Sequence, residues 1–123
     1  MDERGIVWLG SSRKDLRAMP EHVRQTFGYG LGLAQAGLRH PDTKQLKGFN
    51  PALVEILEDD DGDTYRAVYC AKFDDIIYVL HCFKKKSTKG GNLPMAEKET
   101  IERRLARLRE LEAARLKSKG KKR

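Results

Sequence analysis

Cysteine and histidine are scarce in this chain of 123 residues, which contains 2 cysteines and 3 histidines. Two thiols are too few for a disulfide framework, and neither a C-x-x-C motif nor paired histidines provide the ligand spacing of a zinc site. Cys70 and Cys82 stand in apolar, strand-like sequence, so we expect both thiols to be buried and unpaired. The sequence therefore predicts no metal site, and nothing in it implies a cofactor.

Long hydrophobic runs are also missing from the sequence. The longest ones, such as residues 76–80, are far too short to cross a bilayer. Residues 1–4 lead into no signal-peptide core. We therefore expect a cytoplasmic protein.

Charge is present in excess and is unevenly distributed, although the formal net charge is only +7. Residues 84–123 hold 15 Lys and Arg against 5 Asp and Glu, whereas residues 1–83 hold 10 against 13. Such asymmetry indicates a polyanionic partner, because each phosphate that is neutralised releases condensed counterions. Nucleic acid is the first candidate, ahead of an acidic membrane surface, and we expect no membrane partner.

The pattern of apolar residues predicts a single α+β domain over residues 1–116. An N-terminal strand and two helices precede a three-stranded antiparallel set, and a C-terminal helix with a basic tail follows. The expected strands are residues 6–10, 53–58, 65–73 and 76–83. The first helix is capped by Ser11 or Ser12, the second runs from Pro20 to a stop at Gly37, and residues 38–51 are expected to be a polar connection. Residues 117–123 are expected to form a disordered basic tail.

A β-hairpin is predicted where two strand-like segments meet at Asp74-Asp75. A two-residue turn there pairs Arg66 with Phe83, Val68 with His81, and Cys70 with Val79. In that register Arg66, His81 and Phe83 share one face, and Lys85 extends it. The opposite face is apolar enough to pack on the core and carries Tyr65, Ala67, Tyr69, Ala71, Tyr78, Leu80 and Cys82.

The face that carries Arg66 combines groups suited to RNA chemistry, since such a set can hold phosphates, stack a base and transfer a proton. Cleavage of RNA requires that the 2′-OH lose a proton, that the phosphorane be stabilised and that the leaving 5′-oxygen gain a proton. No metal is obligatory for these steps. Arg66 suits the developing charge because a guanidinium contacts two phosphate oxygens and stays protonated. His81 suits proton exchange because the ordinary pKa of histidine is about 6.5.

Each of these residues also has an ordinary structural interpretation. A lone arginine on a solvated sheet face is common, His81 equally fits a buried strand position, and Phe83 equally fits the edge of the core. Lys47 and Lys85 can act as acids as they stand, and as bases only if neighbouring cations lower the pKa of their amines.

Three short motifs in this order of elements carry a resemblance that spans about residues 6–108. They are Leu46-Lys47-Gly48, the strand Tyr65-Arg66-x-x-Tyr69, and Leu80-His81-x-Phe83-x-Lys85-Lys86. Together they resemble the RelE/ParE superfamily of toxins, and within it the HigB-like, phage-derived branch. The resemblance implies a RelE-like fold, a metal-independent and ribosome-dependent endoribonuclease that cleaves mRNA, and a cognate helix-turn-helix antitoxin that forms a hetero-oligomer with the toxin.

The resemblance and the hairpin register together select the candidate site residues. For catalysis they are Lys47, Arg66, His81 and Lys85, and for RNA binding they are Lys44, Phe83, Lys84, Lys86 and Lys89. Similar proteins often have Glu-Leu-Arg in the first strand of the antiparallel set, whereas this chain has Glu55-Ile56-Leu57. A basic residue is therefore missing from that rim, which affects substrate affinity more than the fold.

Two other functions remain open. One is a non-catalytic inhibitor of DNA gyrase, because the ParE side of the same superfamily acts in this way. The other is a small basic nucleic-acid-binding protein, because phosphate attraction alone explains a cationic C-terminal segment. The aligned arginine and histidine favour the enzyme, since nonspecific binding requires neither of them on one sheet face.

Overall fold

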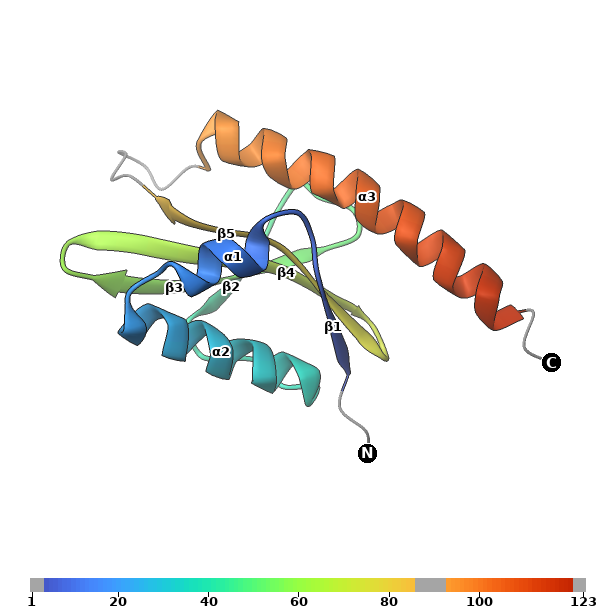
Figure 1. Cartoon of the computed structure of the whole chain (residues 1–123), viewed down its shortest axis with the longest axis horizontal. Coiled ribbons are helices and arrows are strands. Elements are labelled where there is room, and N and C mark those ends of the chain that lie inside the picture. The colour runs from blue at the N-terminus through green and yellow to red at the C-terminus, as the bar shows by residue number, and fades with distance from the viewer. Residues whose placement is uncertain (1–3, 86–92, 121–123) are drawn as a thin grey trace.

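A sheet with helices on both of its faces forms the molecule, and α3 crosses one face while α2 lies against the other (Figure 1). The computed structural model describes residues 4–85 and 93–120. Their elements are β1 (Gly5–Trp8), α1 (Ser12–Arg17), α2 (Glu21–Gln35), β2 (Thr43–Leu46), β3 (Leu53–Asp60), β4 (Asp63–Phe73), β5 (Ile76–Lys85) and α3 (Met95–Gly120).

The strand order is β1-β5-β4-β3-β2, with β1 parallel to β5 and all other neighbours antiparallel. The predicted α+β class and element order are confirmed. The predicted three-stranded antiparallel set is wrong, because in the described residues β2 adds a fourth strand within the expected connection. Four mostly polar and exposed residues form this edge strand, so its sequence has no clear apolar alternation to reveal it.

A β-bulge in β5 alters part of the predicted hairpin register. Arg66 pairs with Phe83 and Val68 pairs with His81 as predicted, but Cys70 pairs with Tyr78 instead of Val79. The register shifts because Leu80 has no partner on β4. The shift moves Tyr78 and Leu80 to the α3 face, so the prediction that they pack with Tyr69 is wrong.

Both faces of the sheet are buried. On one face α2 contributes Val23, Phe27 and Leu31 to a cluster with Ile56 and Tyr69. On the other face of the same strands, α3 packs through an apolar stripe that consists of Ile101, Leu105 and Leu108. The α3 face is therefore largely covered, and three of its charged residues, Glu55, Arg66 and Lys85, are buried.

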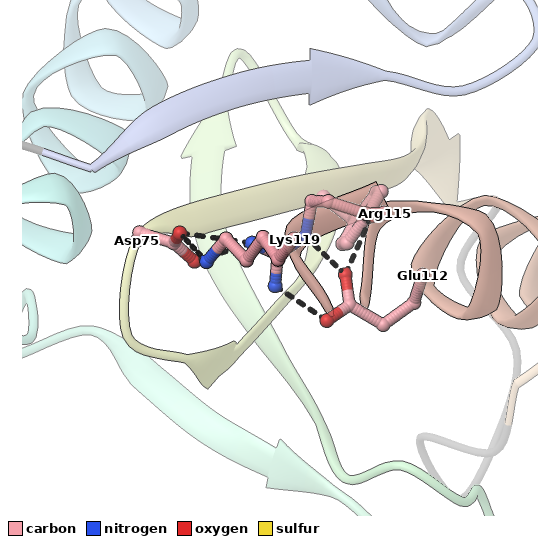
Figure 2. A network of polar contacts seen from close by, with 5 residues as sticks. Asp75, Glu112, Arg115 and Lys119 are labelled. Carbon is pink, nitrogen blue, oxygen red and sulfur yellow. Dashed lines mark hydrogen bonds and ion pairs between the residues drawn. The ribbon is translucent and has the colours of Figure 1, made fainter. Parts of the chain in front are cut away.

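The end of α3 is held to the β4–β5 turn by a polar network (Figure 2). Arg115 donates to Asp75 at 2.8 Å and also pairs with Glu112, while Lys119 pairs with Asp75. The hydroxyl of Tyr78 donates to Glu112 at 2.8 Å. The helix continues to Gly120, four residues into the segment 117–123 for which the sequence predicts a disordered tail, and residues 121–123 lie outside the described part.

Cys70 and Cys82 are buried and unpaired, as predicted, and they pack on opposite faces of the sheet. Burial raises the pKa of both thiols, that of Cys82 to about 12. Within residues 4–85 and 93–120, no helix has an apolar stretch long enough to cross a membrane.

Candidate functional site

The α3 face of the sheet holds a cleft of about 520 Å³ with a largely charged lining, which we call the charged cleft. Its charged residues come from three strands, the turn after β2 and the first turns of α3: Lys44, Lys47, Glu55, Arg66 and Lys98. Strand pairing explains the grouping, because Lys44 pairs with Glu55 and Arg66 pairs with Leu57. Directly paired residues, and residues two apart on a strand, share one face.

Among the described residues, Arg66 is anchored in this cleft through one of its three nitrogens. Its Nη1 donates to the two carboxylate oxygens of Glu55 at 3.3 and 3.2 Å, and Lys44 Nζ lies 3.4 Å from the same carboxylate. Arg66 is 4% exposed and Glu55 is 0% exposed. The Nε of Arg66 is buried without a partner, and Nη2 makes no hydrogen bond to the described residues. Nε is therefore a charged donor that no described residue satisfies, and it is enclosed by protein atoms.

Lys85 lies on the same sheet face, next to the charged cleft. It is 5% exposed, and no ion pair joins it to another described residue. Burial lowers the pKa of its amine, and the positive charges of Arg66 and Lys44 lower it further, while Glu55 acts in the opposite direction. A lowered pKa makes Lys85 a better proton carrier near neutral pH than an exposed lysine.

The lysines predicted for the site are divided among several places. Lys44 and Lys47 line the charged cleft with exposed side chains. Lys84 is turned to the other face, because successive residues of a strand alternate, and pairs with Asp63 at 3.6 Å. Lys86 and Lys89 lie outside the described residues.

His81 uses both ring nitrogens inside the protein. Arg104 Nη1 lies 3.2 Å from Nδ1, and Glu97 Oε1 lies 2.9 Å from Nε2. An arginine can only donate, so Nδ1 accepts and Nε2 carries the proton that it donates to Glu97. Burial lowers the pKa of the imidazole; Glu97 opposes this shift and Arg104 adds to it. His81 is thus a neutral residue that joins β5 to α3.

Arg104 and Gly10 support this arrangement, and the sequence did not indicate either of them. Arg104 also donates to Leu80 O at 2.9 Å and to Ser11 Oγ at 3.0 Å. Gly10 has a φ of +54°, and a Cβ there would lie 2.5 Å from Arg104 Nε. The sequence shows a glycine after the first strand, but the guanidinium that lies against it belongs to Arg104 in α3, which is far from Gly10 in the sequence.

Phe83 is 7% exposed and stacks on His81, with ring centroids 4.6 Å apart and planes at 23°. One face of the ring is therefore covered by a protein residue. Phe83 packs in the cluster beneath α3, which agrees with its structural interpretation and leaves a base-stacking role without support.

A second cleft, of about 430 Å³, lies beside the end of β5. Its wall is mostly apolar and consists of Ala18, Met19, Pro20, Tyr65, Cys82 and Phe83. Three polar residues complete the lining: Asp15, His81 and Lys84. We call this second cleft the apolar cleft.

Glu55 is the functional residue that sequence reasoning missed in the charged cleft. It is the one carboxylate in the lining of that cleft, as the described residues define it. Its signal was a glutamate inside the apolar run Leu53-Val54-Glu55-Ile56, because a buried carboxylate requires a cationic partner. In the described part of the chain, no group of three or more His, Cys, Asp or Glu side chains is placed to hold a metal ion.

Comparison with known proteins gives one match. The model of the family described as "Phage derived protein Gp49-like (DUF891)" matches residues 14–106, which include the lining of both clefts. No curated protein and no solved structure matches the chain significantly. The match covers well over half of the chain. The chain therefore belongs to the Gp49-like (DUF891) family of phage-derived proteins, a family within the RelE/HigB-like toxin group.

Proposed function

We propose that this protein is the toxin of a type II toxin–antitoxin pair and that it cleaves mRNA on the ribosome. The proposal rests on the environment of the Arg66 guanidinium. Its guanidinium is buried, anchored by Glu55 through Nη1, and has an unpartnered Nε in a cleft with Lys44, Lys47 and Lys98. A fixed guanidinium edge among other cations is the arrangement that stabilises a phosphorane.

In the proposed reaction, the 2′-oxygen attacks the adjacent phosphorus while the bond from phosphorus to the 5′-oxygen breaks. Arg66 stabilises the additional negative charge on the phosphorane oxygens. Glu55 is assigned to hold Arg66 in place, because both of its carboxylate oxygens accept from Nη1 and its side chain is buried, and the 2′-OH proton passes to solvent. Lys85 is assigned as the donor of a proton to the leaving 5′-oxygen, because the pKa of its amine is lowered. Lys44 and Lys47 hold flanking phosphates.

His81 has a different role in the proposal from the one that its sequence position suggested. Both of its ring nitrogens are engaged, by Glu97 and by Arg104. A proton donor to RNA requires a free N–H directed at the substrate. We therefore assign His81 to the attachment of α3, so that its effect on cleavage is indirect.

The proposed partner is a helix-turn-helix antitoxin that forms a hetero-oligomer with this chain, as the family resemblance implies. The test is coexpression with the product of the adjacent gene. The complex is expected to copurify, and coexpression is expected to restore growth. Growth arrest that the neighbouring product does not relieve contradicts this part of the proposal.

The decisive experiment is mRNA cleavage in a purified translation system with programmed ribosomes. Wild-type protein is expected to cut message within the translated region, and an Arg66→Lys variant is expected to be nearly inactive. The variant retains a cation beside Glu55 but lacks the second guanidinium edge. Intact message together with inhibited DNA supercoiling by gyrase contradicts the proposal and favours the gyrase inhibitor.

A further inference from the structure

Phe49 is an aromatic residue in the lining of the charged cleft. It is half-buried and packs at the edge of the apolar cluster beneath α3, so part of the residue remains accessible. With Leu46 and Leu93 it forms the apolar part of a lining that is otherwise mostly charged. A cleft of about 520 Å³ falls within the range of small-ligand sites, which combine apolar walls with a few polar groups. The charged cleft therefore has the size and the walls to take an organic group as well as a phosphate.

A smaller cleft, of about 250 Å³, adjoins the charged cleft at Phe49. We call it the Arg109 cleft, and its lining consists of Gly48, Phe49, Asn50, Glu102, Leu105 and Arg109. As the described residues define the two linings, Phe49 is the one residue that they share. Phe49 therefore stands between two hollows of the surface, whereas a side chain that only fills the core borders none.

The backbone on either side of Phe49 is constrained. Arg109 donates from Nε and Nη2 to the carbonyl oxygen of Asn50, at 3.2 and 2.7 Å, and these hydrogen bonds join the β2–β3 connection to α3 (Figure 1). Gly48 has a φ of +93°, in the left-handed region that favours glycine, and nothing lies within 4 Å of an added Cβ. A side chain on such a constrained segment loses little freedom when a ligand packs against it.

Three exposed lysines share the lining of the charged cleft with Phe49: Lys44, Lys47 and Lys98. Exposed lysines bind phosphates as point charges, while an aromatic ring stacks on the face of any base. A cleft that combines both kinds of group is typical of proteins that bind single-stranded nucleic acid. A double helix offers its phosphates but keeps the faces of its bases stacked on one another, so it has no base to place on the ring.

We propose that Phe49 stacks on an unpaired base of the RNA, next to the phosphates that Lys44 and Lys47 hold. The proposal rests on the proposed function, and it adds that the protein binds a single-stranded stretch through a base as well as through its backbone. Phe83 does not offer the same contact, because His81 covers one face of its ring at 4.6 Å. Stacking accepts every base, so Phe49 positions the strand without setting a sequence preference.

The test is a double-mutant cycle between Phe49 and one base, with affinity measured by fluorescence anisotropy. The ligand is a short single-stranded oligonucleotide with 2′-O-methyl groups, which cannot be cut, and each nucleotide is replaced in turn by an abasic one. Wild-type protein is expected to lose about tenfold in affinity at one position, because a stacked base contributes about that much. Phe49→Leu is expected to bind the intact oligonucleotide about tenfold more weakly and to show no further loss at that position.

Two further variants separate stacking from packing. Phe73→Leu is the matched control, because Phe73 is also half-buried and packs against the same apolar cluster but lines neither of these clefts. It should keep the affinity of the wild type and the loss at the abasic position. Phe49→Trp retains an aromatic face, so it should also keep that loss. A purely structural role for Phe49 predicts the reverse order, in which the smaller leucine is tolerated better than the larger tryptophan.

The outcomes distinguish this proposal from the proposed function. If wild-type protein cleaves mRNA but no abasic position lowers its affinity, or if Phe49→Leu shows the same loss there as wild type, base stacking is overturned and the proposed function stands. If the cycle shows the coupling but mRNA on ribosomes stays intact, Phe49 is confirmed as an RNA-binding residue and the proposed function is overturned. Absence of both binding and cleavage overturns both.

Discussion

The charged cleft and the apolar cleft share strand β4 but are otherwise built from different elements and are stabilised in different ways. Arg66 and Glu55 hold the charged cleft through buried ion pairs, with Lys44 at its rim. The apolar cleft is shaped by packing and by the hydrogen bonds that Arg104 makes to Ser11, Leu80 and His81. A hairpin of alternating side chains can therefore present two chemically distinct sites one residue apart. Substitutions in one cleft are therefore expected to leave the other largely unaffected.

Arg66→Lys is expected to have the largest effect, which is confined to the charged cleft. The cleavage rate should fall about 100-fold, the cost of removing one charge-stabilising donor. Glu55 keeps a cationic partner, so the thermal midpoint should change little. The measurement is single-turnover cleavage beside thermal unfolding followed by circular dichroism.

Tyr65→Phe is the control for this variant, because Tyr65 is the neighbouring residue and belongs to the other cleft. It should retain the rate of phosphodiester cleavage on a saturating substrate. An Arg66→Lys protein that is folded and fully active contradicts the assignment of Arg66.

Glu55→Gln is expected to reduce stability more than any other change in the charged cleft. Arg66 and Lys44 would lose the negative charge between them, and a hydrogen bond to a charged group contributes about 2 kcal/mol. The free energy of unfolding should fall by about that amount in urea denaturation. Cleavage should be lost as well, at a temperature where the variant is still folded. A variant with wild-type stability contradicts the role of Glu55 as the anchor of Arg66.

Gly10→Ala is expected to loosen the wall of the apolar cleft. Its φ of +54° is unfavourable for alanine, and the new Cβ would collide with Arg104. The left-handed conformation costs about 1–2 kcal/mol by itself. Gly62→Ala is the matched control, since its φ is +83° and nothing lies within 4 Å of the added Cβ. Gly10→Ala should be the less stable of the two, and equal stabilities contradict the close approach of Arg104.

Cys82, in the lining of the apolar cleft, and Lys85, beside the charged cleft, are expected to change the free energy of unfolding in opposite directions as the pH rises. The pKa of Cys82 is raised to about 12, so the unfolded chain releases this proton first and stability falls as the pH rises above 9.0. The expected loss is about 1 kcal/mol at pH 10. The pKa of Lys85 is lowered from 10.5 because its charged form is buried beside other cations. This charge destabilises the folded state, and the destabilisation disappears as the amine loses its proton while the pH rises toward 10.5.

Urea denaturation between pH 8 and pH 10 measures this difference. Cys82→Ala should reduce the loss of stability over this range, and Lys85→Met should increase it. If the free energy of unfolding changes with pH by the same amount in both variants, the two groups do not act in opposite directions.

Lys47→Ala is expected to have the smallest effect and to act on binding alone. Its side chain is exposed at the rim of the charged cleft. The slope of log affinity for single-stranded RNA against log salt should decrease by about 0.7, the value of one phosphate contact. Lys72→Ala, exposed on β4 away from both clefts, is the control and should leave the slope unchanged. A slope equal to that of wild type in Lys47→Ala contradicts its phosphate contact.

Local patterns predicted the helices, the long strands and the first rungs of the hairpin. The pairs of Arg66 with Phe83 and of Val68 with His81 followed from a two-residue turn and were confirmed. The pair of Cys70 with Val79 was wrong, because no local signal marks Leu80 as a bulge. The edge strand β2 was missed for a similar reason, since three polar residues and one leucine acquire strand geometry only by pairing with β3.

The candidate site was predicted in part. Arg66, Lys44 and Lys47 meet in one cleft, and Lys85 lies beside it. His81 was expected on the same face, but α3 occupies both of its ring nitrogens. That contact joins residues far apart in sequence, and no spacing rule predicts it. Glu55 was visible only as a charge in an apolar strand, and its partner became clear once β3 and β4 were paired.

The sequence by itself determined the class of the fold, the two buried thiols and the concentration of positive charge, because composition and periodicity act over short distances. Only the tertiary structure decided which nitrogen of Arg66 is left without a partner, which lysines face each cleft and how His81 is engaged. These depend on strand pairing, a bulge and the docking of α3. All three are settled by packing between distant segments and not by the residues next to them in the chain.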